Sequence, residues 1–234
     1  MIKKLDSWCD ELWIYFMCLV GGFSIGLLIA NWNTWDAGVK AGLFGAIIMP
    51  FHVIEEWKLP GGLHHIYNVM FASRKYGNKY LNRYPMSRFT DMLTNIFLCL
   101  IPLVYALLAA NHGLSAEVSI CMILFGFMEL FAHTAVGIYS FIRYRSAGKR
   151  TIYDPGFGTS ILMFLPASVY LIRNLPATTA SNWLVGILLM VIMAVISVPL
   201  AEFPFRNWVR DRKDGAFVFE NAKYYQKFVD RGRW

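Results

Sequence analysis

Five side chains that can ligate a metal ion occur in two short stretches of the sequence. His52, Glu55 and Glu56 form the pattern His-x-x-Glu-Glu, and Glu129 and His133 are four residues apart. On a helix, residues three or four positions apart lie on one face. Imidazole with carboxylate suits zinc, or iron where carboxylates dominate. We therefore expect a divalent metal site in which His52, Glu56 and His133 are ligands and Glu55 or Glu129 is the fourth ligand or the general base.

Other polar residues are candidates for supporting roles, and each has a structural alternative. Asp91 is expected either to support the site or to cap a helix, and Asn95 either to support it or to bond between helices. His64 and His65 are adjacent, so on a helix they point about 100° apart and at most one joins the cluster; interfacial anchoring is the alternative. The predicted supporting residues are Asp91, Asn95, Tyr153 and Thr159, and the outside candidates are His64, His65 and Glu202.

These residues lie in or beside long apolar runs. Hydrophobic residues make up 57% of the 234 residues and charged residues 16%, whereas a soluble domain is about one quarter charged. A membrane span needs about 20 mostly apolar residues. We therefore predict an all-α, polytopic membrane bundle with about six spans, of which the fifth is the shortest: 12–30, 39–57, 89–110, 117–141, 158–173 and 183–203.

The basic residues predict the orientation of this bundle. All lysines and arginines except Lys40 and Arg173 fall on one side of a six-span arrangement. The positive-inside rule makes that side cytoplasmic, with both termini there. The chain is thus predicted to lie in a bacterial cytoplasmic membrane, and contact with anionic lipid accounts for the net charge of +7. No nucleic-acid partner is needed, and an oligomer is compatible with the sequence.

The orientation also predicts how deep the candidate ligands lie. At about 1.5 Å per residue, His52 is about 7 Å from the cytoplasmic end of its span, His133 about 12 Å and Glu129 about 18 Å. Asn95 is about 10 Å deep by the same count. The side chains of three spans are therefore expected in one leaflet, as for a shared site.

Two segments on the cytoplasmic side are predicted to lie along the membrane surface. Residues 61–73 are expected as an interfacial amphipathic helix. The tail after residue 203 mixes aromatic with basic residues, which favours a surface cap, with a solvated tail as the alternative. We divide the chain into a transmembrane domain, 1–203, and a basic aromatic tail, 204–234.

Three stretches together resemble the HXXEE-domain family of bacterial integral membrane proteins. They are HVIEEWKLPGG at 52–62, ELFAH at 129–133 and YDPGFGT at 153–159, and the resemblance covers roughly residues 40–172. It implies polar groups suspected of enzymatic or metal-binding work, and no established reaction. In the third stretch, Pro155-Gly156 predicts a turn and Thr159 a helix cap, with backbone amides that can hold a lipid phosphate or a substrate carboxylate. A simple turn is the alternative.

Three functions compete on these observations. The leading hypothesis is a metal-dependent membrane enzyme that opens to the cytoplasmic leaflet and acts on a lipid-like or hydrophobic small molecule, by hydrolysis with zinc or by oxidation with two irons. A transporter or ion-conducting protein would use the same groups as a relay, but the outer halves of the spans are nearly free of polar residues. A non-catalytic membrane scaffold is the third.

Overall fold

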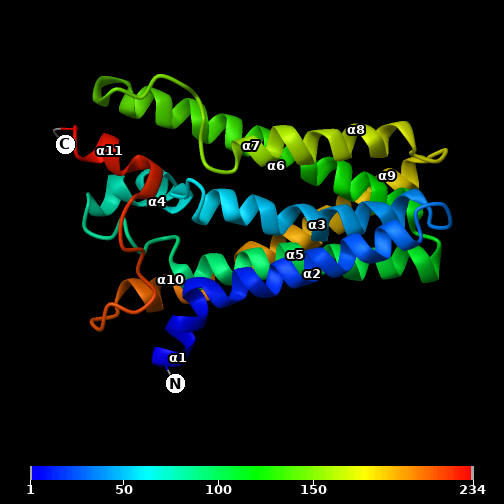
Figure 1. The fold of residues 1–234 in the computed structure, drawn as a ribbon, viewed down its shortest axis with the longest axis horizontal. Coiled ribbons are helices and arrows are strands. Elements are labelled where there is room, and N and C mark those ends of the chain that lie inside the picture. Colours follow the sequence, from blue (N-terminus) through cyan, green and yellow to red (C-terminus); the bar gives the residue numbers. More distant parts are fainter. Residues whose placement is uncertain (1, 233–234) are drawn as a thin grey trace.

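The computed structural model describes residues 2–232, and its regular secondary structure is helical, as predicted (Figure 1). The longest continuous helical stretches are Ile2–Ala30, Ala37–Trp57, Arg88–His112, Ser115–Ala147 and Ala180–Arg210. Each is long and apolar enough to cross a membrane. Their elements are α1 (Ile2–Ser7), η1 (Trp8–Leu12), α2 (Trp13–Ala30), α3 (Ala37–Trp57), α5 (Arg88–His112), α6 (Ser115–Tyr144), η2 (Arg145–Ala147), α9 (Ala180–Val195), η4 (Ile196–Leu200) and α10 (Phe203–Arg210).

The segment expected as the fifth and shortest span, 158–173, forms the helix Phe157–Arg173, made of α7 (Phe157–Thr159), η3 (Ser160–Phe164) and α8 (Leu165–Arg173). At 1.5 Å per residue it is about 25 Å long, shorter than the five long helices. Among the described residues, five helices have the length and hydropathy of a membrane span, and this sixth apolar helix is shorter.

Side-chain caps begin three of the long helices. The Asp36 side chain accepts a hydrogen bond from the Val39 amide at the start of α3. Ser87 and Thr179 form capping boxes at the starts of α5 and α9, which satisfy amides that have no partner within the helix. The alternative role of Asp91 as the cap of its helix is therefore wrong, because Ser87 takes that position.

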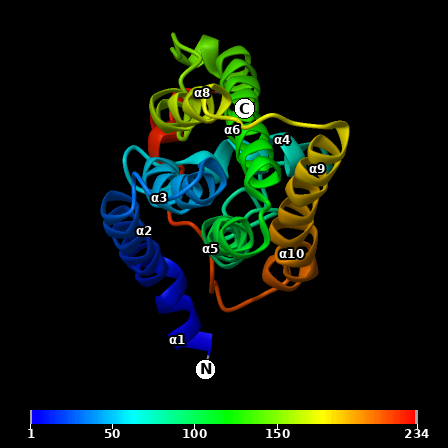
Figure 2. The ribbon, with the colours of Figure 1, turned by 90° about the vertical axis from the view of Figure 1, so that its right-hand side faces the viewer.

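Helix α3 lies at the centre of the bundle and packs against α5, α2 and α6. Figure 2 looks along the bundle and shows α3 surrounded by α2, α5 and α8. The close approach to α5 requires glycine: a Cβ at Gly45 would lie 2.8 Å from Pro102 Cβ and 2.6 Å from Met122 Cε. The candidate ligands of α3 are thus held inside the bundle.

The outer helices present large apolar side chains away from the bundle. Leu19 of α2 is 74% exposed, and Leu184 of α9 is 69% exposed. An apolar surface of this kind is stable against lipid rather than water. The prediction of a membrane protein is confirmed at this level by the five candidate spans.

One end of the bundle carries the cap formed by α4 (Leu63–Tyr76), the loop 145–156 and the C-terminal segment 211–232, and we call it the basic end. Figure 1 shows both ends of the chain here. The segment expected at 61–73 as an interfacial helix is α4, and four of its apolar and amide residues are fully or almost fully buried against the cap. The C-terminal segment includes η5 (Lys223–Tyr225) and α11 (Gln226–Val229).

The predicted domain boundary at 203/204 lies next to a turn at residues 201–202, and the chain beyond it packs on the bundle. The Phe217 amide donates to Asp6 Oδ1 at 2.7 Å, and its carbonyl accepts from the Arg88 amide at 3.0 Å. Phe217 and Tyr225 are completely buried. The last segment is therefore an integral part of the basic end.

Candidate metal centre

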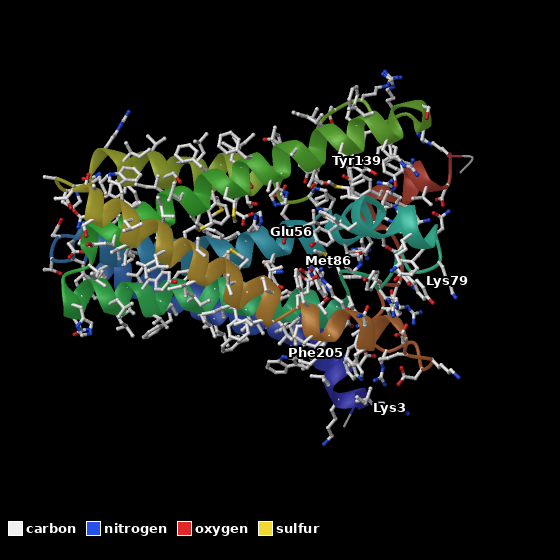
Figure 3. All side chains as sticks on the ribbon, turned by 180° about the vertical axis from the view of Figure 1, so that it is seen from behind. Lys3, Glu56, Lys79, Met86, Tyr139 and Phe205 are labelled. Carbon is white, nitrogen blue, oxygen red and sulfur yellow. The ribbon has the colours of Figure 1, made fainter. Side chains whose placement is uncertain are left out.

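Two helices bring four of the predicted ligands together near the basic end. His52 and Glu56 lie one turn apart on α3, and Glu129 and His133 lie one turn apart on α6. Figure 3 shows Glu56 inside the bundle, toward the basic end. His52 is 2% exposed and His133 4%, so these side chains face each other rather than lipid.

The two imidazoles meet through their Nε2 atoms, which are 3.2 Å apart. Glu56 Oε1 lies 3.2 Å from Nε2 of His52 and 3.3 Å from Nε2 of His133. Glu129 Oε2 lies 3.4 Å from the first and 3.7 Å from the second. In a tetrahedral zinc site with bonds of about 2.0–2.2 Å, neighbouring ligand atoms are about 3.3–3.6 Å apart. The observed separations are those of ligand atoms around one ion.

His52, Glu129 and His133 can each offer one ligand atom, and these three atoms lie within 4.8 Å of one another. Glu56 Oε1 lies slightly closer to both imidazoles than Glu129 Oε2 does. Within the described chain, no lysine or arginine forms an ion pair with either glutamate. Only protons or a metal ion can therefore balance the two carboxylates locally.

A hydroxyl group sets the orientation of the first imidazole. Thr159 Oγ1 has one proton, which it donates to Glu55 Oε2 at 2.7 Å. Its oxygen therefore accepts from Nδ1 of His52 at 2.8 Å. A neutral imidazole that donates from Nδ1 presents a free lone pair at Nε2, as metal-ligating histidines do.

Glu55 is turned away from this cluster and is fully occupied by other partners. Its carboxylate accepts hydrogen bonds from the Tyr153 hydroxyl at 2.9 Å, the Gly158 amide at 2.9 Å, and both the amide and the hydroxyl of Thr159 at 2.7 Å. The expectation that Glu55 is a ligand or general base does not fit this geometry. The backbone amides at this helix start, expected to hold a phosphate or a substrate carboxylate, bind the carboxylate of Glu55. Thr159 also donates its hydroxyl to Glu55.

The sequence that carries this cluster matches a family model. The family described as "Protein of unknown function with HXXEE motif" matches residues 43–171, more than half of the chain. The chain belongs to the HXXEE family. No curated protein and no solved structure matches it. The matched range contains all four clustered residues and the segment around Thr159 and ends before α9.

In this HXXEE protein the three motif residues therefore take two different positions. His52 and Glu56 point into the cluster, and Glu55 binds the start of the helix Phe157–Arg173. Glu55 thereby joins α3 to the segment that orients His52. The motif combines two residues of the cluster with one structural carboxylate.

Asp154 orients the second imidazole, a role that the sequence analysis missed. His133 Nδ1 lies 3.3 Å from Asp154 Oδ2, and the Tyr225 hydroxyl donates to Asp154 Oδ1. Asp154 is completely buried. Burial raises its pKa, and the hydrogen bonds from His133 and Tyr225 oppose that rise. The position of an aspartate within YDPGFGT was a signal in the sequence, whereas nothing there connected Tyr225 to it.

Gly156 allows the close approach of this segment to His133. Its φ is +99°, in the left-handed region, and a Cβ there would overlap the His133 ring. Gly158 is similarly close to Glu55, since a Cβ would lie 2.8 Å from Oε1. The two glycines let one short segment contact a ligand and the structural carboxylate together.

Asp91 and Asn95 lie outside the four-residue cluster and are hydrogen-bonded to each other. Trp57 Nε1 donates to Asp91 Oδ2, and Asn95 Nδ2 donates to Asp91 Oδ1 at 2.9 Å and to its carbonyl at 3.0 Å. Both are buried. Neither bonds directly to the four clustered side chains, and Trp57, which follows the motif, links α3 to Asp91.

The outside candidates do not join the cluster. His64 Nε2 donates to the Asn221 carbonyl at 3.0 Å and its ring stacks on Phe219. His65 Nε2 is 2.8 Å from the Tyr144 hydroxyl. Burial lowers the pKa of His64 to about 3 and that of His65 to about 4. Glu202 bonds to Arg206 instead. The four cysteines are free thiols.

Proposed function

We propose that this HXXEE protein is a metal-dependent membrane enzyme whose centre is formed by His52, Glu129, His133 and Glu56. The observation that carries the proposal is the meeting of the two Nε2 atoms, each on an imidazole whose Nδ1 has its own acceptor. Two lone pairs and two carboxylates at one point repel each other without a shared cation. The ligand set suits zinc, or iron.

We assign three ligands and one base. His52, Glu129 and His133 would hold the ion, because each offers a ligand atom within 4.8 Å of the other two. Three protein ligands leave a position for water, as in catalytic rather than structural zinc sites. A divalent ion bound there supplies activation of water for attack on an ester or amide. Glu56, beside both imidazoles, would take the proton from that water and pass it to the leaving group.

Thr159 and Asp154 would keep each imidazole in the tautomer that faces the ion. Both contacts are made from the 153–159 segment, which also contains the amides that bind Glu55. Outer hydrogen-bond partners of this kind raise ligand basicity and fix ring orientation. The centre is thus supported from outside the two ligand-bearing helices.

A hydrophobic, lipid-like substrate is supported by the position of the cluster. Thr159, which contacts His52, is followed three residues later on the same helix by Leu162, which is 76% exposed. The helix that orients His52 therefore also carries apolar surface that would face lipid. By the positive-inside rule, the basic end would face the cytoplasm, so the substrate would enter from that leaflet.

Metal analysis of the purified protein tests the proposal. We expect about one equivalent of zinc or iron per chain, lost on His52→Ala and on His133→Ala. His112→Ala, at an exposed position at the end of α5, is the matched control and should keep its metal. Helical content measured by circular dichroism checks the fold of each variant. Folded wild-type protein that takes up no metal would refute the proposal and leave a proton relay or a structural cluster.

A further inference from the structure

Two adjoining cavities open at the basic end, away from the metal centre. They lie between α4, the C-terminal end of α6 with η2, and residues 221–232, and their volumes are about 330 and 690 Å³. Asn78, Arg143 and Tyr144 line both. Volumes of 300–1,000 Å³ are typical of small-molecule sites. The space is therefore large enough for a ligand of metabolite size.

The walls of these cavities are positively charged. Arg74, Arg143 and Arg231 line the larger cavity, and Lys79 and Arg143 line the smaller one. No aspartate or glutamate is among their lining residues in the described chain. The nearby C-terminal ends of α4 and α6 contribute only about half a negative charge each. The net charge around the cavities therefore remains strongly positive, which favours the binding of an anion.

The basic side chains come from three separate parts of the chain. Arg74 is on the last turn of α4, Arg143 on the last turn of α6, and Arg231 follows α11. Arg231 Nη1 would lie 3.4 Å from a Cβ at Gly148, so its guanidinium lies over the turn that follows η2. Three guanidinium groups around one space match the several oxygens of a phosphate group.

The smaller cavity is partly apolar. Its lining includes Val69, Leu81, His64 and His65, together with amide side chains. The lowered pKa values keep both imidazoles neutral at neutral pH. A partly apolar cavity that adjoins a more strongly basic one fits a molecule with an anionic head and an uncharged body.

We propose that these cavities bind a phosphate ester, with the phosphate at Arg74, Arg143 and Arg231 and the organic body in the smaller cavity beside His64 and His65. The phosphate group belongs either to a soluble metabolite or to a lipid headgroup. The inference is independent of the proposed metal centre, because none of the four clustered residues lines either cavity.

Binding to the full-length protein tests this site. The soluble probe is glycerol 3-phosphate, measured by isothermal titration calorimetry in an uncharged detergent. The lipid probe is phosphatidylglycerol in nanodiscs, measured as an increase in thermal midpoint over phosphatidylcholine nanodiscs. The variant is the pair Arg74→Gln and Arg231→Gln. The control pair, Arg150→Gln and Arg173→Gln, removes the same charge at exposed positions outside the cavities.

We expect at least one probe to bind and the cavity pair to weaken it at least tenfold, or to abolish the thermal increase, while the control pair leaves it unchanged. Binding of glycerol 3-phosphate identifies a soluble ester, and a response to phosphatidylglycerol alone identifies a headgroup. The proposal is overturned if neither probe binds or if both pairs weaken binding equally. Metal content should be the same in all variants, which separates this result from the fate of the metal centre.

Discussion

His52 and His133 approach through their Nε2 atoms to 3.2 Å although 81 residues separate them in the sequence. Each uses its other ring nitrogen to contact the 153–159 segment, His52 at Thr159 and His133 at Asp154. One short segment thereby aims imidazoles from two different helices at a common point. The predictions below test separate parts of this arrangement.

The two clustered glutamates should differ in their effect on metal affinity. Glu129 is assigned as a ligand together with His52 and His133, whereas Glu56 is assigned as the base. We expect Glu129→Gln to weaken zinc binding at least 100-fold and Glu56→Gln to weaken it less than tenfold, as measured by competition with a chromophoric chelator. If Glu56→Gln weakens zinc binding more than Glu129→Gln does, Glu56 is the ligand and Glu129 is the base.

Loss of the Tyr225 hydroxyl should weaken metal binding without removing the ring. Tyr225→Phe leaves Asp154 with one donor fewer, and outer-partner substitutions typically cost about 10–100-fold in metal affinity. We expect a loss of about tenfold and a fall of about 1 kcal/mol in the free energy of unfolding. Tyr139→Phe, which packs against the same aromatic cluster, is the control. Equal affinities in both variants would show that Tyr225 only packs.

Glu55→Gln should destabilise the protein and spare its metal. The carboxylate accepts from four donors, and an amide nitrogen cannot accept from any of them. We expect a loss of about 1–3 kcal/mol in stability with one metal ion still bound per chain. A folded Glu55→Gln variant that binds no metal would show that Glu55 is a ligand.

Two glycines with positive φ provide a matched pair. Gly156 has φ +99° with His133 in the path of a Cβ, and Gly215 has φ +68° with nothing within 4 Å. Alanine at either position should cost about 1 kcal/mol or more through the backbone. Only Gly156→Ala should also lower metal affinity, because it displaces the imidazole. Unchanged affinity in Gly156→Ala would show that His133 is not held by this contact.

The buried pair on α4 predicts a pH dependence of stability in the presence of chelator. Burial lowers the pKa of His64 to about 3 and that of His65 to about 4, below the usual 6.5. Below pH 6.5 the unfolded chain binds protons that the folded chain does not, so stability falls with pH down to about pH 4. Two such groups contribute up to about 2.7 kcal/mol per pH unit.

Thermal midpoints between pH 7.5 and 5 measure this effect. His65→Gln should reduce the slope, and His112→Gln should leave it unchanged. A wild-type slope that is the same in His65→Gln would show that other groups control acid unfolding.

The sequence predicted the helical class and four of the clustered side chains, because helical spacing places residues four apart on one face. It did not separate the roles of Glu55 and Glu56, since adjacent residues differ by about 100° and only the packing of α3 decides which faces α6. Asp154 and Tyr225 depend on how a loop and the C-terminal segment fold onto the bundle. Such contacts carry no periodic pattern along the chain.

The most direct test of the metal centre is X-ray absorption spectroscopy of protein loaded with one equivalent of zinc. The proposed centre predicts a four-coordinate ion with two imidazoles, one of which is lost in His133→Ala. A zinc environment that contains no imidazole, or one that His133→Ala leaves unchanged, would contradict the assignment of His52 and His133 to a single ion.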